Sequence, residues 1–171
     1  IALGLVLEAA TGIPNEEYLA TRLWQPMGAE QTATWSHGPN GAVLPFCCLN
    51  ATLRDYARLG QVLLDDGARN GIQLVPRASV DASPTPNAPR LLPGDNPASS
   101  WTLGYAYHWW VPENPLDEFM AIGIWGQYIY VDRARNVVIV KKSADYDFDV
   151  RDHETVEVFR AISAHFDIDP A

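Results

Sequence analysis

Apolar positions recur with a helical period in the first part of the chain. In residues 1–10 they fall on Leu3, Val6, Leu7 and Ala10, and Thr11-Gly12 supplies a stop. A second helix is expected over residues 14–25, because a proline stands near its first turn and two glutamates follow at the positive end of the helix dipole. Pro26-Met-Gly28 ends it, and residues 29–50 carry no sustained period, as in a loop or irregular strand.

The strongest helical pattern begins at Thr52. Thr52 and Asp55 have the spacing of an N-capping pair. The stripe expected to face the core consists of Tyr56, Leu59, Leu63 and Leu64. Glycines and an Asn-Gly pair at residues 67–71 then turn the chain back, and a short helix is expected after Pro76.

Alternating and β-branched patterns replace the helical period after residue 100. Residues 101–111 are expected to form one strand, with Trp109 and Trp110 on its opposite faces. Two further strands are expected within residues 118–132, joined by a sharp turn, and a third over residues 136–140. A closing helix is expected over residues 151–166, with contacts to the core through Val156, Phe159, Ile162 and Ala164.

This order of helices, antiparallel strands and a last helix predicts an α+β fold. The interpretation is one unit over residues 1–171, with a helical part at 1–83 and strands plus the closing helix at 101–171. Residues 84–100 contain five prolines, so they are expected to form a loop rather than regular structure. Because neither side is long enough to fold alone, we read this loop as packed on the domain and not as a linker.

Charge and cysteine content narrow the function classes. The formal net charge of −9 argues against nucleic acid or an anionic membrane as the main partner, since both bind positive surfaces. No apolar run approaches the length of a membrane span. The two cysteines are adjacent, Cys47 and Cys48, and we expect both to be buried small apolar residues rather than a disulfide.

Metal and cofactor chemistry is not indicated. The four histidines, His37, His108, His153 and His165, have no ligand spacing and are expected at the surface or in turns. The acidic pairs Asp65-Asp66 and Asp117-Glu118 are interpreted as solvated residues at element ends. No glycine-rich phosphate loop and no Gly-x-Ser-x-Gly motif occurs. The sequence therefore predicts neither a metal nor a cofactor.

The turn at residues 123–126 is the main candidate for chemistry. Gly123 and Gly126 bracket Ile124-Trp125, so backbone there can approach a ligand closely, and a strand-edge amide can donate to an oxyanion. The same spacing also suits an ordinary structural bulge. Four tryptophans, Trp101, Trp109, Trp110 and Trp125, lie in or beside the strands around this turn, where they suit either a cleft wall or the core.

Several segments together resemble one enzyme superfamily. The stretch Asn50-Ala-Thr-Leu-Arg-Asp-Tyr-Ala-Arg-Leu-Gly-Gln-Val-Leu-Leu64 resembles a helix of the serine hydrolases that include class C β-lactamases, penicillin-binding proteins and esterases. The opening Ile1-Ala-Leu-Gly-Leu-Val-Leu-Glu-Ala-Ala-Thr-Gly12 looks like the segment that follows that family's Tyr-x-Asn motif. Tyr105-Ala-Tyr-His-Trp-Trp110 and Ala121-Ile-Gly-Ile124 look most like the branch that contains 6-aminohexanoate-dimer hydrolases.

The resemblance implies acyl transfer on the C-terminal portion of a β-lactamase/transpeptidase-like fold. In the family, a serine of Ser-x-x-Lys attacks a carbonyl and two backbone amides hold the oxyanion. By resemblance, the second amide belongs to Ile124, with Gly123 allowing close approach. Ile122, Trp110 and Trp125 are the expected substrate-binding residues. The expected partner is a small ester or amide substrate.

Two family motifs are missing from these residues. The only lysines are Lys141 and Lys142, so no Ser-x-x-Lys occurs, and no Tyr-x-Asn occurs either. Ala121-Ile122 replaces the Lys-Thr of the third motif, so a β-lactam carboxylate would lack its positive partner. We therefore expect the nucleophile and its bases upstream of Ile1, in a missing N-terminal part of the same protein, and we expect residues 1–171 alone to be inactive and poorly soluble.

Two alternatives remain open at the level of sequence. One is a non-catalytic binding module whose tryptophans stack on a sugar or peptide. The other is a penicillin-binding-like protein that has lost catalysis. Binding without turnover would favour the first, and an upstream serine without its lysine would favour the second.

Overall fold

The structure is a computed structural model that describes residues 1–97 and 101–166. Its helices are α1 (Ala2–Thr11), α2 (Asn15–Leu19), the π-helix η1 (Ala20–Trp24), α3 (Leu53–Leu64), α4 (Arg77–Ala82), the 3₁₀-helix η2 (Pro89–Leu91) and α5 (Asp152–Ala164). Its strands are β1 (Thr34–Trp35), β2 (Leu49–Asn50), β3 (Ala68–Arg69), β4 (Ile72–Gln73), β5 (Gly104–Ala106), β6 (Trp109–Val111), β7 (Glu118–Gly123), β8 (Gln127–Asp132) and β9 (Val137–Lys141). The expected α+β order is therefore confirmed.

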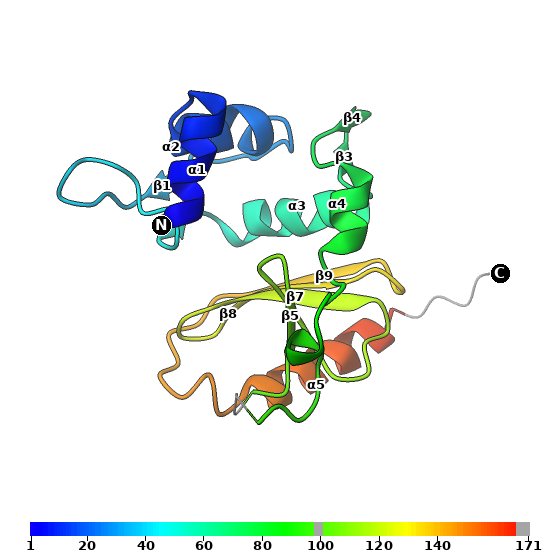
Figure 1. The fold of residues 1–171 in the computed structure, drawn as a ribbon. Coiled ribbons are helices and arrows are strands. Elements are labelled where there is room, and N and C mark those ends of the chain that lie inside the picture. The colour runs from blue at the N-terminus through cyan, green and yellow to red at the C-terminus, as the bar shows by residue number, and fades with distance from the viewer. Residues whose placement is uncertain (98–100, 167–171) are drawn as a thin grey trace.

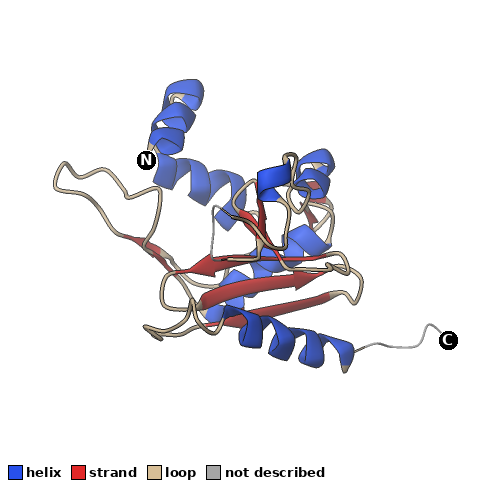
Figure 2. Ribbon diagram, turned by 60° about the horizontal axis from the view of Figure 1, so that its bottom comes forward, coloured by secondary structure: helices blue, strands red, loops and turns tan. Residues whose placement is uncertain are grey.

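A five-stranded antiparallel sheet forms the middle layer, in the order β5-β6-β7-β8-β9. Helices α3 and α4 lie on one side of it and α5 on the other (Figure 1). The two long central strands pair in register from Glu118↔Asp132 to Gly123↔Gln127. Figure 2 shows these strands passing over the last helix.

Strand β6 pairs with β7 only through Trp110↔Met120. Beyond that point, β7 from Ala121 to Gly123 is paired with β8 alone. One edge of this end of β7 is therefore free of any paired strand among the described residues, and its backbone groups on that side can reach a ligand.

Successive side chains along each strand point to opposite faces of the sheet, so the core is divided between the two faces. Phe119 and Val131 pack with Leu63 and Val80 under α3 and α4. Met120, Tyr128 and Tyr130 pack with Val156 and Phe159 of α5. As expected, Trp109 and Trp110 separate, the first onto the α3 face and the second onto the α5 face.

Helix α3 sits close to the sheet because a glycine faces it. A Cβ at Gly60 would come within 2.6 Å of Cγ1 of Val138, on β9. The expected cap at its start is confirmed: the Thr52 hydroxyl accepts the amide of Asp55 at 3.1 Å. The expected stripe is only partly right, because Leu63 is buried whereas Tyr56, Leu59 and Leu64 are half-buried.

Two buried carboxylates tie α5 to the sheet. Glu118 accepts from Nε of Arg160 at 2.8 Å and from the hydroxyl of Tyr130. Asp132 accepts the hydroxyl of Ser163 at 2.6 Å. The interpretation of Glu118 as a solvated end residue was wrong: it starts β7 and its surface is 1% exposed, because Arg160 neutralises it inside the structure.

The expected single strand over residues 101–111 is a hairpin instead. Tyr107 and His108 turn the chain between β5 and β6 with φ of 46° and 71°. Non-glycine residues rarely adopt such values, and the sequence there has none of the usual turn residues to signal it. The four histidines are exposed, as expected.

The faces of two helices also differ from expectation. In α5, Val156 and Phe159 are buried as expected, but Ile162 and Ala164 are exposed and Ser163 is buried in their place. The reason is the hydrogen bond of Ser163 to Asp132, which fixes the rotation of the last turn. In α1, Leu3 and Val6 are more than 60% exposed, so its apolar stripe has no covering layer among the described residues.

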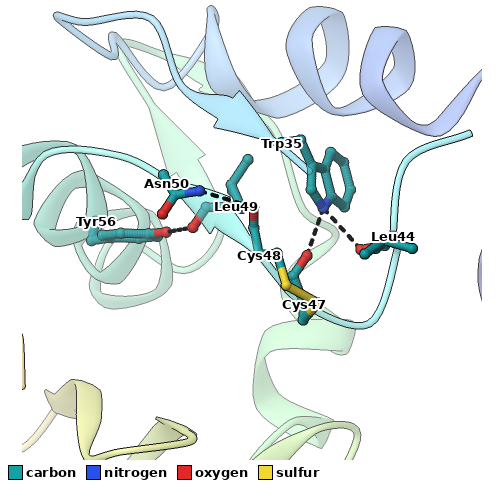
Figure 3. The surroundings of a disulfide bond; sticks show 7 residues. All are labelled: Trp35, Leu44, Cys47, Cys48, Leu49, Asn50 and Tyr56. Carbon is teal, nitrogen blue, oxygen red and sulfur yellow. Dashed lines mark hydrogen bonds between the residues drawn. A yellow bond between two sulfur atoms is a disulfide. The ribbon is translucent and has the colours of Figure 1, made fainter. Parts of the chain in front are cut away.

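The interpretation of the cysteines was wrong as well. Cys47 and Cys48 form a disulfide between adjacent residues, with Cα atoms 3.7 Å apart. Cys47 is half-buried and Cys48 is exposed, so neither is a core residue. Their surroundings are shown in Figure 3.

No helix in residues 1–97 or 101–166 has the length and apolarity needed to cross a bilayer.

Candidate active site

The β7–β8 hairpin turns through Ile124, Trp125 and Gly126. The amide of Gly126 donates to the carbonyl of Gly123 at 3.1 Å, which closes a β-turn. Trp125 has φ of 68°, while Ile124 has no positive φ, the pattern of a type II turn. That position favours glycine, and a bulky residue there stores strain of about 1–2 kcal/mol. Such strained positions cluster at functional sites.

The amide of Ile124 directly follows the last residue of β7, at the end of the strand that pairs with β8 alone. No acceptor within the described part of the chain is hydrogen-bonded to it. The side chain of Ile124 is 68% exposed and blocks no approach from solvent. A backbone donor of this kind can hold an oxyanion once a substrate carbonyl is placed against it.

The segment after β9 packs around this turn. Gln127 donates to the carbonyl of Ser143 at 2.7 Å, and the amide of Asp145 donates to the carbonyl of Trp125 at 3.1 Å. A Cβ at Gly126 would lie 3.0 Å from Cβ of Phe148. Residues 143–148 therefore hold the turn, which keeps it in one conformation.

Aromatic rings extend from the turn in two directions. The exposed ring of Trp125 contacts Tyr146, with centroids 5.7 Å apart. On the other side, Phe148 contacts Trp101 at 6.4 Å, and Trp101 contacts Trp110 at 4.9 Å. The first pair offers an exposed surface for a ligand, and the second connects the turn to the sheet.

The expected site residues separate into two groups. Gly123, Ile124 and Trp125 meet at the turn. Ile122 and Trp110 are partly buried and pack against the core cluster under α5. Gly123 has ordinary backbone, and its lack of a side chain leaves room for Gln127, whose Oε1 would lie 2.6 Å from an added Cβ.

Neither lysine stands in for the missing lysine of the third family motif. Lys141 lies 5.2 Å from the centre of the Tyr128 ring and 3.4 Å from the hydroxyl of Thr155. Lys142 donates to the carbonyl of Ala51 at 3.4 Å. The described residues also contain no cluster of three or more histidine, cysteine or acidic side chains arranged to hold a metal ion.

A cavity of about 360 Å³ lies at the opposite end of β7, lined in part by Asp81, Glu118 and Arg133. It is about 17 Å from the turn, at roughly 3.4 Å per strand residue. On the α5 face of the sheet, burial and the adjacent Glu118 raise the pKa of Tyr130, so its phenol stays protonated and donates to Glu118. The charges at this end form ion pairs among themselves and with two helices: Arg133 pairs with Asp81 of α4, and Glu118 pairs with Arg160 of α5.

Comparison with known proteins shows the family to which the chain belongs. A family model described as Beta-lactamase matches residues 1–157. The chain belongs to the β-lactamase family. It is 30% identical over 150 residues to the 6-aminohexanoate-dimer hydrolase of Paenarthrobacter ureafaciens. The family resemblance expected from the sequence is therefore confirmed, and the fold is that of a β-lactamase-like serine hydrolase.

Two solved structures resemble this family member. One is a candidate 6-aminohexanoate-dimer hydrolase from Bacillus anthracis, with a TM-score of 0.85, 28% identity and 99% of this chain covered. The other is a candidate β-lactamase from Bacteroides dorei, with a TM-score of 0.60, 16% identity and 90% of this chain covered, which shows the fold alone. The chain spans 38% of the Paenarthrobacter protein, 43% of the Bacillus protein and 54% of the Bacteroides protein.

Sequence reasoning missed the segment that supports the turn. Ser143, Asp145, Tyr146 and Phe148 were not expected at the site, because residues 142–150 have no strand or helix period. The alternation of acidic and aromatic residues from Asp145 to Asp149 was the one available signal.

Proposed function

We propose that this chain is the C-terminal part of a serine hydrolase that cleaves small esters or amides through an acyl-enzyme. A serine from the N-terminal part attacks the substrate carbonyl, and the carbonyl electrons move to oxygen. The amide of Ile124 donates to that oxyanion. Collapse expels the alcohol or amine, and water then releases the acid and regenerates the serine.

The observation that carries the proposal is the amide of Ile124. It has no hydrogen-bond acceptor among the described residues, and it lies at the end of β7 that β6 does not pair. Residues 143–148 hold the turn that contains it. Two relatives carry the name 6-aminohexanoate-dimer hydrolase, which supports amides as one of the two proposed substrate types, esters and amides.

The substrate class follows from the residues around that amide. Ala121 and Ile122 bring no positive charge to β7, and both lysines are engaged elsewhere. A carboxylate on the substrate would therefore lack a cationic partner on this strand. The exposed Trp125 and Tyr146 rings instead offer apolar contact, which suits an uncharged aliphatic or aromatic acyl group.

The proposal that an N-terminal part completes the domain rests on exposed apolar surface. Ile1, which precedes α1, and Leu3, Leu5 and Val6 of α1 are between 61% and 71% exposed, as in a layer that another segment covers. Strand β9 also pairs on one side only within the described sheet. The missing part is the proposed source of both the serine and this cover.

The test compares Ile124→Pro with Ile124→Ala in the complete protein. Proline removes the amide hydrogen, and the second position of a type II turn accepts proline without distortion. We expect Ile124→Pro to lower kcat on a p-nitrophenyl ester about 100- to 1,000-fold. Ile124→Ala keeps the donor and should retain kcat within about threefold. Equal kcat values for the two variants would overturn the assignment.

A second candidate function is ligand binding without turnover, favoured by the exposed Trp125–Tyr146 pair. It predicts that Trp125→Ala weakens ligand binding while no ester or amide is hydrolysed at any protein concentration. Measured turnover that depends on the amide of Ile124 would exclude it.

A further inference from the structure

The adjacent cysteines lie in the long loop that joins β1 and β2. This loop, residues 36–48, projects from the body of the molecule (Figure 1). Cys48 is exposed and Cys47 half-buried, and the chain contains no other cysteine. Small thiols in solution can therefore reach the pair, and within this chain neither cysteine has another possible partner.

The backbone around the pair is held by donors from outside it (Figure 3). The indole nitrogen of Trp35 donates to the carbonyls of Leu44, at 2.9 Å, and Cys47, at 2.7 Å. The carbonyl of Cys48 accepts from the amide of Ser36 at 3.2 Å and from the side chain of Asn50 at 3.1 Å. The loop is thus anchored to β1 at the site of the disulfide.

Cys48 adopts a left-handed backbone conformation, with φ of 70°. An L-residue with a Cβ leaves this region unless its surroundings hold it there. The disulfide closes a small ring through Cys47 and Cys48 and is one of the constraints that hold it. If the ring opens, φ of Cys48 can relax, and its carbonyl then turns away from Ser36 and Asn50.

We propose that Cys47 and Cys48 form a reversible thiol–disulfide site, whose reduced form binds trivalent arsenicals and similar thiophiles through both sulfurs. A small dithiol reduces the site: one S–S bond breaks, the dithiol becomes a disulfide, and its two electrons and two protons pass to Cys47 and Cys48. An arsenical RAs=O then forms two As–S bonds, and the two thiol protons leave with its oxygen as water.

The site does not depend on the proposed hydrolase. Its conformational effect falls on the loop and on β2, which continues through Ala51 into the cap of α3 at Thr52. On the other side of the loop, Pro45 fits against Gly4 of α1, where an added Cβ would lie 2.6 Å from Cγ of Pro45. Opening the ring is therefore expected to loosen residues 44–50 rather than the sheet.

The first test uses peptide masses to measure the redox state and arsenical binding of the two cysteines in the complete protein. Trypsin without reductant releases residues 23–54, which carry both cysteines. We expect this peptide to be two hydrogens lighter than its dithiol form, and to gain those hydrogens after native protein is treated with dithiothreitol. After removal of the dithiothreitol, reduced protein should take up one phenylarsenic group from phenylarsine oxide at this peptide and keep it in excess monothiol, whereas Cys48→Ser should lose any arsenical to the monothiol. A peptide that stays as two thiols after treatment with a small disulfide, or that binds no arsenical, overturns the site.

The second test uses the rate of proteolysis to measure how open the loop around the disulfide is. Chymotrypsin cleaves after Phe46, whose side chain is 60% exposed. Cys48→Ser opens the ring and leaves the scissile Phe46–Cys47 bond unchanged, so we expect cleavage there to be at least threefold faster than in the oxidised protein. Cleavage after the exposed Tyr146 serves as the control and should keep its rate. Equal rates after Phe46 in the two proteins overturn the coupling between the ring and the loop.

Discussion

Asp55 shows how one buried charge fixes the start of a helix. It has no exposed surface, accepts the amide of Glu30 at 2.8 Å and pairs with Arg58 at 3.0 Å. Burial alone would raise the pKa of its carboxyl, but the hydrogen bonds from Glu30, Thr52 and Gln31, with the charge of Arg58, outweigh burial and lower it. The charged form is therefore the one that stabilises the fold.

The first prediction concerns the pH dependence that Asp55 contributes. Its stabilisation is present above the ordinary carboxyl pKa of 3.8 and is lost as the pH falls through the lower pKa of the folded state. Asp55→Asn should lower the free energy of unfolding at pH 7 by about 2–3 kcal/mol. The gap between wild type and variant, measured by urea unfolding, should narrow below about pH 4. A gap that stays constant with pH would contradict the role of the charge.

The ion pair between Glu118 and Arg160 acts at the scale of elements, because it joins β7 to α5. Arg160 also donates to the carbonyl of Glu113 at 2.7 Å, so one side chain holds three segments together. Burial opposes the charge of Arg160, but Glu118 outweighs it and raises the pKa of the guanidinium.

The second prediction separates the buried partner of Arg160 from the exposed one. Arg160→Ala leaves Glu118 buried and unpaired and should lower the free energy of unfolding by about 3–5 kcal/mol. The matched control is Glu157→Ala, which removes the surface partner of Arg160 at 3.0 Å. That pair is exposed, so the control should change stability by less than about 1 kcal/mol. Equal losses by thermal unfolding would show that burial does not decide the effect.

The third prediction concerns the strained turn between β7 and β8. Trp125→Gly places glycine where a type II turn favours it, so stability should stay within about 1 kcal/mol of wild type. Under the proposed function, KM for an aromatic ester should rise about tenfold, because the exposed ring is lost. The control is Gly126→Ala, which forces a Cβ against Phe148 at φ of 76° and should cost about 1–2 kcal/mol. An unchanged KM in Trp125→Gly would show that Trp125 is not part of the binding surface.

Several elements could be predicted from sequence because their signals are local. Three such signals each span only a few residues: the Thr52–Asp55 cap, the glycines of the β7–β8 turn and the β-branched run of β9. The burial of Glu118 could not be predicted, because Arg160 lies 42 positions away. The turn at Tyr107-His108 was missed because neither residue type signals a positive φ.

The candidate site was predictable only in part, for the same reason. The turn with Gly123 and Ile124 carries a local glycine pattern, and the family resemblance gave it a role. The support from Ser143, Asp145 and Phe148 depends on how the chain returns after β9, which no local pattern records. Nor does the pairing of Cys47 with Cys48 follow from spacing, since disulfides usually join Cα atoms about 4.4–6.8 Å apart, whereas these two lie 3.7 Å apart.

At the scale of the whole molecule, the exposed stripe of α1 makes a prediction about residues 1–171 alone. If an N-terminal part covers Leu3 and Val6 in the complete protein, the isolated chain exposes this surface. It should bind the dye ANS strongly and associate at micromolar concentration, whereas the complete protein should do neither. The matched control is Leu3→Ser/Val6→Ser, which should reduce dye binding by the isolated chain. Dye binding that this variant leaves unchanged would place the apolar surface elsewhere.

The intact mass of the native polypeptide, measured under denaturing conditions before and after reaction with a fluorophosphonate, shows whether residues 1–171 belong to a larger serine hydrolase. We expect a species much heavier than 18.9 kDa that takes up one phosphonyl group on a serine outside residues 1–171. A folded, monomeric species of 18.9 kDa that takes up no label would contradict this expectation and leave ligand binding as the function of the turn.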